Sequence, residues 1–366
     1  MKILIAMSGG VDSSVAAGIL SSDPSNSCIG CTMHLYHNED IGVPASHTCC
    51  SLDDVADARA VAFRLGMPYY VFNFSDDFKE KIIDKFVCSY LRAETPNPCI
   101  DCNRYMKFDK LLDRAAILDC DHVATGHYVR VEECTDGFLL KKAVFEEKDQ
   151  SYVLYMLGQE QLSRLLFPLG GLAKPQVREL AMQYAPNVAA KPDSQDICFA
   201  PDGDYAKIIE LHTGKKAEPG DFVDQEGRIL GRHNGIIRYT IGQRRGLGLP
   251  MGERIYVTDI DPENNTVILG PNEALFRREV LVKDLNWTLG SAPAKEFRCA
   301  AKIRYRHREQ PAMATVQEDG SVLLTFDEPQ RAATPGQAAV LYQGDIVLGG
   351  GVIMRPWFSP PSIFCR

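Results

Sequence analysis

Two stretches of this 366-residue chain place cysteines in polar, turn-forming surroundings. Residues 95–103 (TPNPCIDCN) precede an expected helix, and residues 191–199 (KPDSQDICF) close a turn-rich segment. Cys102 falls near the expected start of that helix, where the helix dipole lowers the pKa of a thiol and raises its thiolate fraction. These features predict a reactive thiol at Cys102, and the Cys-x-x-Cys pair alone fits half a zinc site, a redox pair or a coincidence.

A second chemical signal is the loop of residues 8–14 (SGGVDSS), which lies between an expected strand (2–7) and an expected helix (13–20). Its glycines tolerate positive φ and let the backbone approach a ligand. Successive N–H groups, serine hydroxyls and a helix N-terminus form a cradle for phosphate. No lysine follows in the Walker A arrangement. We therefore interpret the loop as a nucleotide site of another kind, the alternative being a glycine-rich turn without a ligand.

Composition limits the class of protein. Apolar residues make up 45% and charged residues 24% of the chain, which is typical of soluble globular proteins and excludes disordered, collagen-like and coiled-coil chains. No run approaches the ~20 apolar residues needed to cross a bilayer, so we expect a cytoplasmic protein without a membrane partner. Most of the twelve cysteines should be reduced, because disulfide scaffolds are short and secreted. Cys28 and Cys31 lie in an apolar expected strand and are interpreted as core residues.

The net charge of −8 argues on average against a nucleic-acid partner, but the charge is unevenly distributed. Residues 228–254 hold six arginines and one acid, and residues 295–308 hold six basic residues and one acid. Two basic patches on an acidic body indicate a local footprint for a polyanion. The alternative is a pair of solvated strand faces.

Strand and helix patterns alternate through the first half of the chain. The expected strands are residues 2–7, 28–36, 69–74 and 122–125, and the expected helices between them include residues 53–65, 78–91 and 103–118. This order predicts an α/β fold with a doubly wound parallel sheet, whose ligands bind at the carboxyl ends of the strands.

The pattern changes near residue 200. Residues 254–259 and 266–269 flank a Pro-Glu-Asn-Asn turn and predict a hairpin. Short strands are then expected at residues 301–305, 313–316, 322–326, 338–342 and 346–353, which together predict a small β-barrel or sandwich. We expect three domains: a catalytic domain (1–203), a small central linking domain (204–276) and a C-terminal β-barrel (277–366).

The loop of residues 8–14 resembles the SGGxDS loop of the N-type ATP pyrophosphatases, which have an adenine nucleotide alpha hydrolase-like (PP-loop) fold, cleave ATP to AMP and pyrophosphate, and adenylate an oxygen of a second substrate. With its cysteine motifs, the chain resembles the tRNA-specific 2-thiouridylases, which place sulfur on C2 of the wobble uridine. The segments that carry the resemblance span almost the whole chain: residues 6–15, 95–108, 124–130, 148–157, 167–170, 191–199, 239–248, 302–306 and 334–350.

The resemblance implies an ATP site, with Mg²⁺, at Ala6, Met7, Ser8, Gly9, Gly10, Val11, Asp12, Ser13, Met33 and Gly126. It implies contacts with the anticodon loop of Lys-, Glu- and Gln-type tRNAs at Asn97, Pro98, Cys99, His127, Lys148, Asp149, Gln150, Arg304, Tyr305 and Gln337. Arginine at phosphates and tyrosine as a stacking platform suit such RNA loops. The resemblance further implies a monomer whose sulfur comes from a cysteine desulfurase or a sulfur-relay protein.

The same resemblance implies that a persulfide on Cys198 delivers the sulfur and that Cys102 resolves it through a transient disulfide. Many family members carry an aspartate, suggested as a base, where this chain has Cys99, so a carboxylate base is missing at that position. Cys99, Cys102 and Cys198 also fit three ligands of a [4Fe-4S] cluster with one open iron. A third reading makes Cys99 an inert extra thiol.

Two other functions compete with tRNA thiolation. An ATP pyrophosphatase acting on a small molecule leaves both the basic patches and the paired cysteine motifs unexplained. An RNA-binding module with a vestigial ATP loop belongs to another class of protein. Release of pyrophosphate that depends on tRNA separates the three.

Overall fold

The computed structural model describes residues 1–37, 52–192, 197–200, 202–250, 252 and 254–355. Its N-terminal part is built on a five-stranded sheet in the order β3-β2-β1-β4-β7, in which every neighbouring pair is parallel. The strands are β1 (Lys2–Ala6), β2 (Ser27–His34), β3 (Tyr69–Asn73), β4 (His122–Ala124) and β7 (Leu165–Leu166). The predicted parallel sheet is confirmed, while the short edge strand β7 was not among the expected strands.

Helices cover both faces of this sheet, so the predicted doubly wound arrangement is also confirmed. Alternate residues of β1 enter different cores, Leu4 on one face and Ile3 and Ile5 on the other. The face of Ile3 carries α1 (Val11–Ser21) and α3 (Leu52–Arg64), with α9 (Lys174–Tyr184) packed on α1. The face of Leu4 carries α4 (Ser75–Phe78), η1 (Lys79–Ile83), α5 (Asp84–Leu91), α6 (Pro98–Asp101), η2 (Cys102–Lys110) and α7 (Leu111–Ile117).

The helix that carries the first cysteine motif begins at Pro98, earlier than the expected start at Asn103, and runs without a break through α6, η2 and α7. The Asn97 side chain accepts a hydrogen bond from the backbone N–H of Cys99, and Pro98 takes the first helical position. Both features are typical of a helix N-terminus. Cys102 therefore lies one turn inside the helix and not at its end.

Six antiparallel strands near the C-terminus form the predicted barrel. Their order is β12-β15-β14-β13-β16-β17, and β12 pairs with β17 to close the ring. The strands are β12 (Phe276–Trp287), β13 (Glu296–Lys302), β14 (Gln310–Val316), β15 (Val322–Arg331), β16 (Ala338–Gln343) and β17 (Ile346–Ile353). Two expectations need correction: β12 was not predicted, and β13 ends at Lys302, so that Arg304 and Tyr305 follow the strand in a turn.

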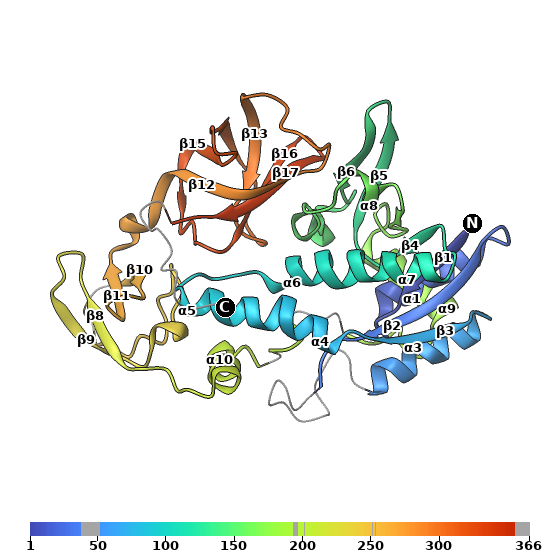
Figure 1. Ribbon diagram of the computed structural model, residues 1–366, viewed down its shortest axis with the longest axis horizontal. Helices are drawn as coiled ribbons and strands as arrows, with labels where there is room; N and C mark the ends of the chain where they lie inside the picture. Colours follow the sequence, from blue (N-terminus) through green and yellow to red (C-terminus); the bar gives the residue numbers. More distant parts are fainter. Residues whose placement is uncertain (38–51, 193–196, 201, 251, 253, 356–366) are drawn as a thin grey trace.

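An unpredicted hairpin joins the barrel to the N-terminal part. The strands β5 (Val129–Cys134) and β6 (Gly137–Lys142) pair with each other, and Lys141 of β6 pairs with Ile346 of β17. The hairpin starts just after β4, so it carries the chain from the carboxyl end of this strand to the barrel. Figure 1 shows the barrel and the hairpin above the long helix formed by α6, η2 and α7.

A smaller sheet, in the order β10-β11-β8-β9, lies at the end of the molecule farthest from the parallel sheet (Figure 1). Its strands are β8 (Gly220–Val223), β9 (Ile229–His233), β10 (Tyr256–Asp261) and β11 (Thr266–Gly270), and α10 (Tyr205–Thr213) precedes them. The predicted hairpin of β10 and β11 is confirmed. Short helical turns complete the chain: η3 (Glu146–Lys148), η4 (Ser151–Val153), α8 (Gln159–Leu162), η5 (Ile236–Arg238) and η6 (Asn272–Leu275).

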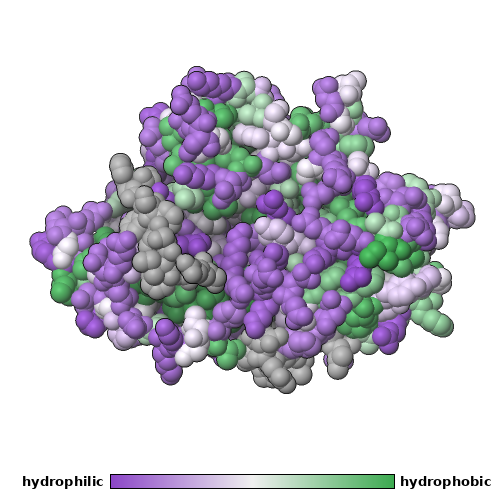
Figure 2. Space-filling model, viewed as in Figure 1, coloured by the Kyte–Doolittle hydropathy of each residue, from purple (hydrophilic) through white to green (hydrophobic). Residues whose placement is uncertain are grey.

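The surface is mostly hydrophilic on the face shown in Figure 2, and its hydrophobic residues form separate patches. Within the described ranges, no helix combines the length and apolar character needed to span a bilayer. Part of each basic patch is neutralised by ion pairs, namely Arg228 with Asp224, Arg232 with Asp221, Arg238 with Glu210 and Arg298 with Asp327. The positive footprint is therefore smaller than the sequence alone indicates.

Candidate active site

The loop of residues 8–14 lies where the strand order of the parallel sheet reverses, between the carboxyl ends of β1 and β4. Ligands bind at this point in doubly wound sheets. Gly9 has a φ of +72°, and a Cβ there would overlap the carbonyl oxygen of Asp54 in α3. Gly10 caps α1, and Ser13 Oγ accepts a hydrogen bond of 3.1 Å from the backbone N–H of Ser8. The loop thus curls around the helix N-terminus as a phosphate cradle requires.

Gly126 closes the other side of this loop. A Cβ on Gly126 would lie 2.7 Å from the backbone nitrogen of Ser13, so only glycine lets the turn after β4 approach α1 this closely. The other residues predicted for the ATP site lie at the same edge of the sheet: Ala6 and Met7 at the end of β1, Val11 at the start of α1 and Met33 near the end of β2. The structure therefore brings the predicted set together.

Two side chains outside the predicted set hold Asp12. The Tyr128 hydroxyl donates a hydrogen bond of 2.7 Å to Asp12 Oδ1, and Lys174 Nζ lies 2.7 Å from the same oxygen. The Asp12 side chain stays 34% exposed. Sequence reasoning did not select Tyr128 or Lys174, because no local pattern links them to a loop more than a hundred residues away.

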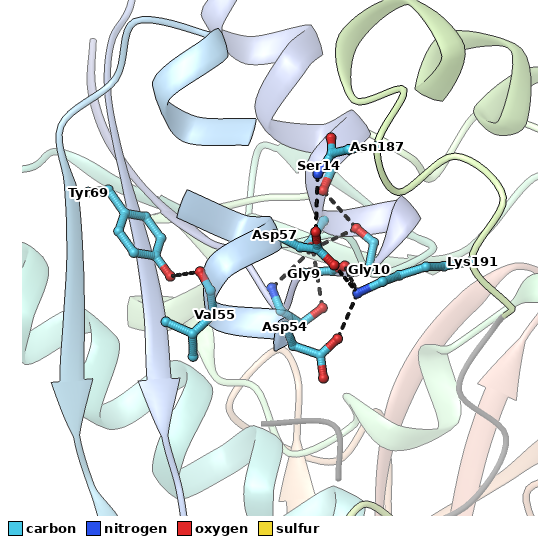
Figure 3. A network of polar contacts seen from close by, with 11 residues as sticks. Gly9, Gly10, Ser14, Asp54, Val55, Asp57, Tyr69, Asn187 and Lys191 are labelled. Carbon is cyan, nitrogen blue, oxygen red and sulfur yellow. Dashed lines mark hydrogen bonds and ion pairs between the residues drawn. The ribbon is translucent and has the colours of Figure 1, made fainter. Parts of the chain in front are cut away.

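Lys191 provides another link to the loop. Its Nζ lies 2.8 Å from Asp54 Oδ1 and 3.1 Å from the Gly9 carbonyl oxygen, and it also pairs with Asp57. Figure 3 shows these groups converging beside the loop. Burial opposes the charged form, but the hydrogen bonds that the ammonium donates to the two carboxylates outweigh it and raise the pKa of Lys191. Residues 191–199 were singled out for Cys198. Nothing in the sequence indicated that the Lys191 side chain contacts the loop of residues 8–14.

The expected activation of Cys102 is wrong in this state of the protein. Burial raises the pKa of Cys102 to about 11, and the nearby Lys107 offsets this only in part. The helix dipole acts mainly on the first turn, and Cys102 is the fifth residue of its helix. The thiolate is therefore a minor species near neutral pH.

Cys198 is positioned by its neighbours. Phe199 is 1% exposed and packs edge-on against the rings of Phe78 and Phe86. The Tyr36 hydroxyl donates a hydrogen bond of 2.9 Å to the Cys198 carbonyl oxygen. Cys102 and Cys198 border the same apolar core. Residues 193–196 of this motif lie outside the described residues.

The cysteines do not assemble a metal site in this structure. Cys99 is exposed on the first turn of its helix, while Cys28 and Cys31 are buried, which confirms their interpretation as core residues. Across the part of the chain that the structure describes, no group of three or more His, Cys, Asp or Glu side chains is placed to hold a metal ion. Cys99, Cys102 and Cys198 are all described, and as they lie here they do not fit a cluster.

A loop of the barrel, residues 335–337, contacts Thr95, which precedes the helix that carries Cys102. The Gln337 side-chain amide donates a hydrogen bond of 2.7 Å to the Thr95 carbonyl oxygen, and the Thr95 N–H donates to the Pro335 carbonyl at 2.8 Å. Gly336 between them has a φ of +87°, and a Cβ there would lie 2.9 Å from the Thr95 nitrogen. This contact brings Gln337 next to the stretch that holds Asn97, Pro98 and Cys99.

Arg304 and Tyr305 belong to a group of cationic and aromatic side chains that follows β13, in which Arg304 is partly buried and Tyr305 is exposed. Lys302 Nζ sits 5.7 Å from the centre of the Tyr152 ring and 5.8 Å from that of Tyr305. Burial lowers the pKa of both Lys302 and Arg304. Arg304 Nε and His307 Nδ1 are buried without a hydrogen-bond partner among the described residues. These side chains thus offer positive charge to an anion and an exposed ring to a stacking base.

Residues 148–150 are built into the turn between the hairpin and the next helical turn. The Asp149 carboxylate accepts hydrogen bonds from the backbone N–H groups of Ala143 and Ser151. The Gln150 side chain accepts one of 2.9 Å from the backbone N–H of Tyr128. Lys148 ends η3. These contacts fix the turn beside Tyr128 and hence beside the loop of residues 8–14.

His127 follows Gly126 and is almost fully buried. Its ring lies 5.9 Å from Phe108 and 6.3 Å from Phe167, and Nδ1 is 2.7 Å from the Thr125 hydroxyl oxygen. Burial, assisted by the positive charge of Lys107, lowers the pKa of His127 well below its usual value. The imidazole is therefore neutral near pH 7.

Comparisons with known proteins cover almost the entire chain. Residues 1–202 match the family model described as "tRNA methyl transferase HUP domain", residues 207–271 the "tRNA methyl transferase PRC-barrel domain" and residues 277–353 the "Aminomethyltransferase beta-barrel domain". These three models correspond to the parallel sheet, the smaller sheet and the closed barrel described above.

Curated relatives are about half identical to this chain. A tRNA-specific 2-thiouridylase MnmA of Clostridioides difficile (strain 630) is 49% identical, over 97% of this chain and 98% of the relative. A tRNA-specific 2-thiouridylase MnmA 2 of Caldanaerobacter subterraneus subsp. tengcongensis is 51% identical, with the same two coverages. A third, from Chloroflexus aurantiacus (strain ATCC 29366 / DSM 635 / J-10-fl), is 48% identical over 97% of this chain and 99% of the relative.

Proposed function

The chain belongs to the family of tRNA-specific 2-thiouridylases, and from this premise we propose how its residues carry out the thiolation of tRNA. ATP binds at residues 6–13, Met33 and Gly126 and adenylates the C2 oxygen of the wobble uridine. Cys198 then delivers the sulfur that replaces this oxygen. The observation that carries the proposal is the contact of Gln337 with Thr95, because it ties the barrel to the segment that leads into Cys102.

Adenylation solves a leaving-group problem. The C2 oxygen of uracil leaves poorly, whereas AMP leaves readily. In the proposed step O2 attacks the α-phosphorus of ATP, pyrophosphate departs and the N3 proton is lost. The N–H groups of residues 8–13 hold the phosphates. Asp12 fits Mg²⁺, since it is a partly exposed carboxylate at the start of α1, and the ion would neutralise phosphate charge.

Sulfur reaches the uridine in two proposed steps. The terminal sulfur of a Cys198 persulfide attacks C2, and AMP leaves with the former O2. The Cys102 thiolate then attacks Cys198 Sγ and breaks the S–S bond, so the sulfur stays on the uridine and a Cys102–Cys198 disulfide forms. A thiol reductant restores both cysteines. A variant of this route releases sulfide from Cys198 before C2 is attacked.

The proposed tRNA surface includes the turn of residues 95–99, His127, the turn of residues 148–150 and, on the barrel, Arg304, Tyr305 and Gln337. Arg304 offers positive charge to a phosphate, and the exposed Tyr305 offers a ring to an unstacked base. We further propose domain limits at residues 203 and 276, and a cytoplasmic monomer that receives sulfur from a cysteine desulfurase or relay protein.

Pyrophosphate release tests this proposal against its competitors. With ATP and unmodified tRNA, the protein should release pyrophosphate, and it should release none when tRNA is omitted. Release without tRNA would favour a small-molecule substrate. No release under any condition would leave only an RNA-binding module.

Cluster chemistry is a separate question, because the three cysteines do not form a metal site as they lie here. Iron and acid-labile sulfide should be measured per chain after anaerobic purification and reconstitution. Little iron supports the persulfide route. Iron near one cluster per chain would overturn it and make Cys99 a ligand.

A further inference from the structure

Lys191 opens the motif that ends in Cys198, yet its side chain leaves that motif and reaches the ATP loop. Its Nζ contacts the Gly9 carbonyl oxygen at 3.1 Å, Asp54 Oδ1 at 2.8 Å and also Asp57 (Figure 3). An ammonium group has three N–H donors, so all three are engaged. The lysine side chain is 30% exposed, and water therefore screens these contacts only in part.

The contacts of Lys191 join the loop to α3. The first turn of α3 forms one wall of the loop, because the Asp54 carbonyl packs against Gly9 where a Cβ would stand. Lys191 bridges this wall to the Gly9 carbonyl oxygen. A second hold on α3 comes from Tyr69, whose hydroxyl lies 3.3 Å from the Val55 carbonyl oxygen. The loop is thus held by the Lys191 side chain and by the backbone of α3, which Tyr69 contacts in turn.

Lys191 also reduces the negative charge beside the loop. Asp54 and Asp57 place two carboxylates beside a loop whose proposed ligand is a polyphosphate, and like charges at this range repel. Lys191 lies within ion-pair distance of both carboxylates, whereas Lys174 is paired with Asp12. Loss of the Lys191 ammonium would remove the positive charge that lies within ion-pair distance of both carboxylates.

We propose that Lys191 is a positioning residue of the ATP site, which holds the Gly9 carbonyl against α3 and offsets part of the negative charge of Asp54 and Asp57 so that the triphosphate can bind. This inference rests on the proposed function and extends it to the cysteine motif. The backbone of Lys191 is itself fixed, since Arg178 donates hydrogen bonds of 2.8 Å to the carbonyls of Ala189 and Lys191. Lys191 therefore links the proposed ATP site to the segment that leads to Cys198.

Calorimetric binding of AMP-PNP with Mg²⁺ to the full-length protein tests the proposal. Lys191→Met should weaken binding about tenfold or more, because the two carboxylates then face the phosphates. Lys191→Arg keeps the charge and should stay within about threefold of the wild type. Asn187→Ala is the matched control: Asn187 contacts Asp57 at 3.3 Å from the same turn as Lys191, and its loss should leave binding unchanged.

Adding Asp54→Asn and Asp57→Asn to Lys191→Met separates charge from folding. This triple variant removes both carboxylates together with the lysine, so no added negative charge faces the phosphates. It should therefore recover most of the lost affinity even if Lys191→Met alone is unstable. In turnover assays, Lys191→Met should raise the KM for ATP and leave kcat nearly unchanged.

Three results would overturn the inference. They are wild-type affinity in Lys191→Met, no recovery in the triple variant, and a loss in Asn187→Ala as large as in Lys191→Met. Each of them leaves the proposed function standing. A wild-type protein that binds no nucleotide would overturn both.

Discussion

The two halves of the proposed reaction are prepared to different degrees in this structure. On the ATP side, Gly9 is fixed by Lys191 and Asp54, and Asp12 is fixed by Tyr128 and Lys174. On the sulfur side, Cys102 is only partly exposed, and burial raises its pKa to about 11. The fold alone therefore preorganises the proposed nucleotide loop, whereas it leaves the Cys102 thiol without activation. In the proposed reaction, the thiol chemistry then needs a further component. We expect tRNA to be that component, because the barrel loop already contacts the segment that leads into Cys102.

The largest expected effect lies on the sulfur side. Cys198→Ser should abolish 2-thiouridine formation and leave tRNA affinity nearly unchanged, because in the proposed mechanism Cys198 carries the sulfur and makes no contact needed to hold RNA. Product is measured by mass spectrometry of digested tRNA. Cys134→Ser, on the β5–β6 hairpin, is the control and should retain activity. Retained thiolation in Cys198→Ser would remove this residue as the sulfur carrier.

Gly9→Ala tests the preformed ATP side. The new Cβ would overlap the Asp54 carbonyl and push α3 from the loop, so we expect thiolation to fall by about a hundredfold. Gly66→Ala is a matched control, because Gly66 has nearly the same φ of +70° but open space around its Cα. It should cost about 1 kcal/mol of stability and no nucleotide affinity. Equal losses in the two variants would mean that backbone strain alone, and not the loop wall, explains the effect.

The pH dependence of Cys102 alkylation sharpens the contrast. A thiolate forms only above the pKa, so without tRNA the rate should rise about tenfold per pH unit from pH 8 to pH 10. In urea the same thiol should level off near its ordinary pKa of about 8.5. Iodoacetamide labelling with peptide mass spectrometry gives the rates. If tRNA activates Cys102, saturating tRNA shifts the profile to lower pH. An unchanged profile would contradict the activation of Cys102 by tRNA.

The smallest expected effect concerns the barrel. Arg304→Ala should weaken tRNA binding and reduce the slope of log K against log salt by about one unit, if Arg304 neutralises one phosphate. Arg298→Ala is the control from the same basic patch, because Arg298 is already paired with Asp327 at 2.6 Å and should change the slope little. Filter binding at several salt concentrations gives both slopes. Equal slopes for Arg304→Ala and the wild type would take Arg304 out of the interface.

The parallel sheet and the ATP loop could be predicted because their signals are local. The loop of residues 8–14 directly follows an apolar run, and the glycine spacing itself carries the chemistry. Tyr128, Lys174 and Lys191 reach the loop only through the tertiary fold, and nothing next to them in the sequence marks that reach. The pairing of the β5–β6 hairpin with β17 is equally non-local.

The sequence misled most clearly at Cys102. The cap formed by Asn97 moves the helix start to Pro98, which takes Cys102 out of the first turn. Burial then dominates the pKa of its thiol, and burial depends on packing between distant segments. Spacing in the sequence singled out Cys102 as a candidate but could not give its protonation state.

The most direct test follows the oxygen that sulfur replaces. Unmodified tRNA made with uridine labelled by ¹⁸O at C2 should be incubated with the protein, ATP and a persulfide donor. If O2 is adenylated, one ¹⁸O atom appears in the phosphate of AMP for each 2-thiouridine formed, and AMP and pyrophosphate appear in equal amounts. AMP free of ¹⁸O alongside 2-thiouridine would contradict adenylation of the uridine.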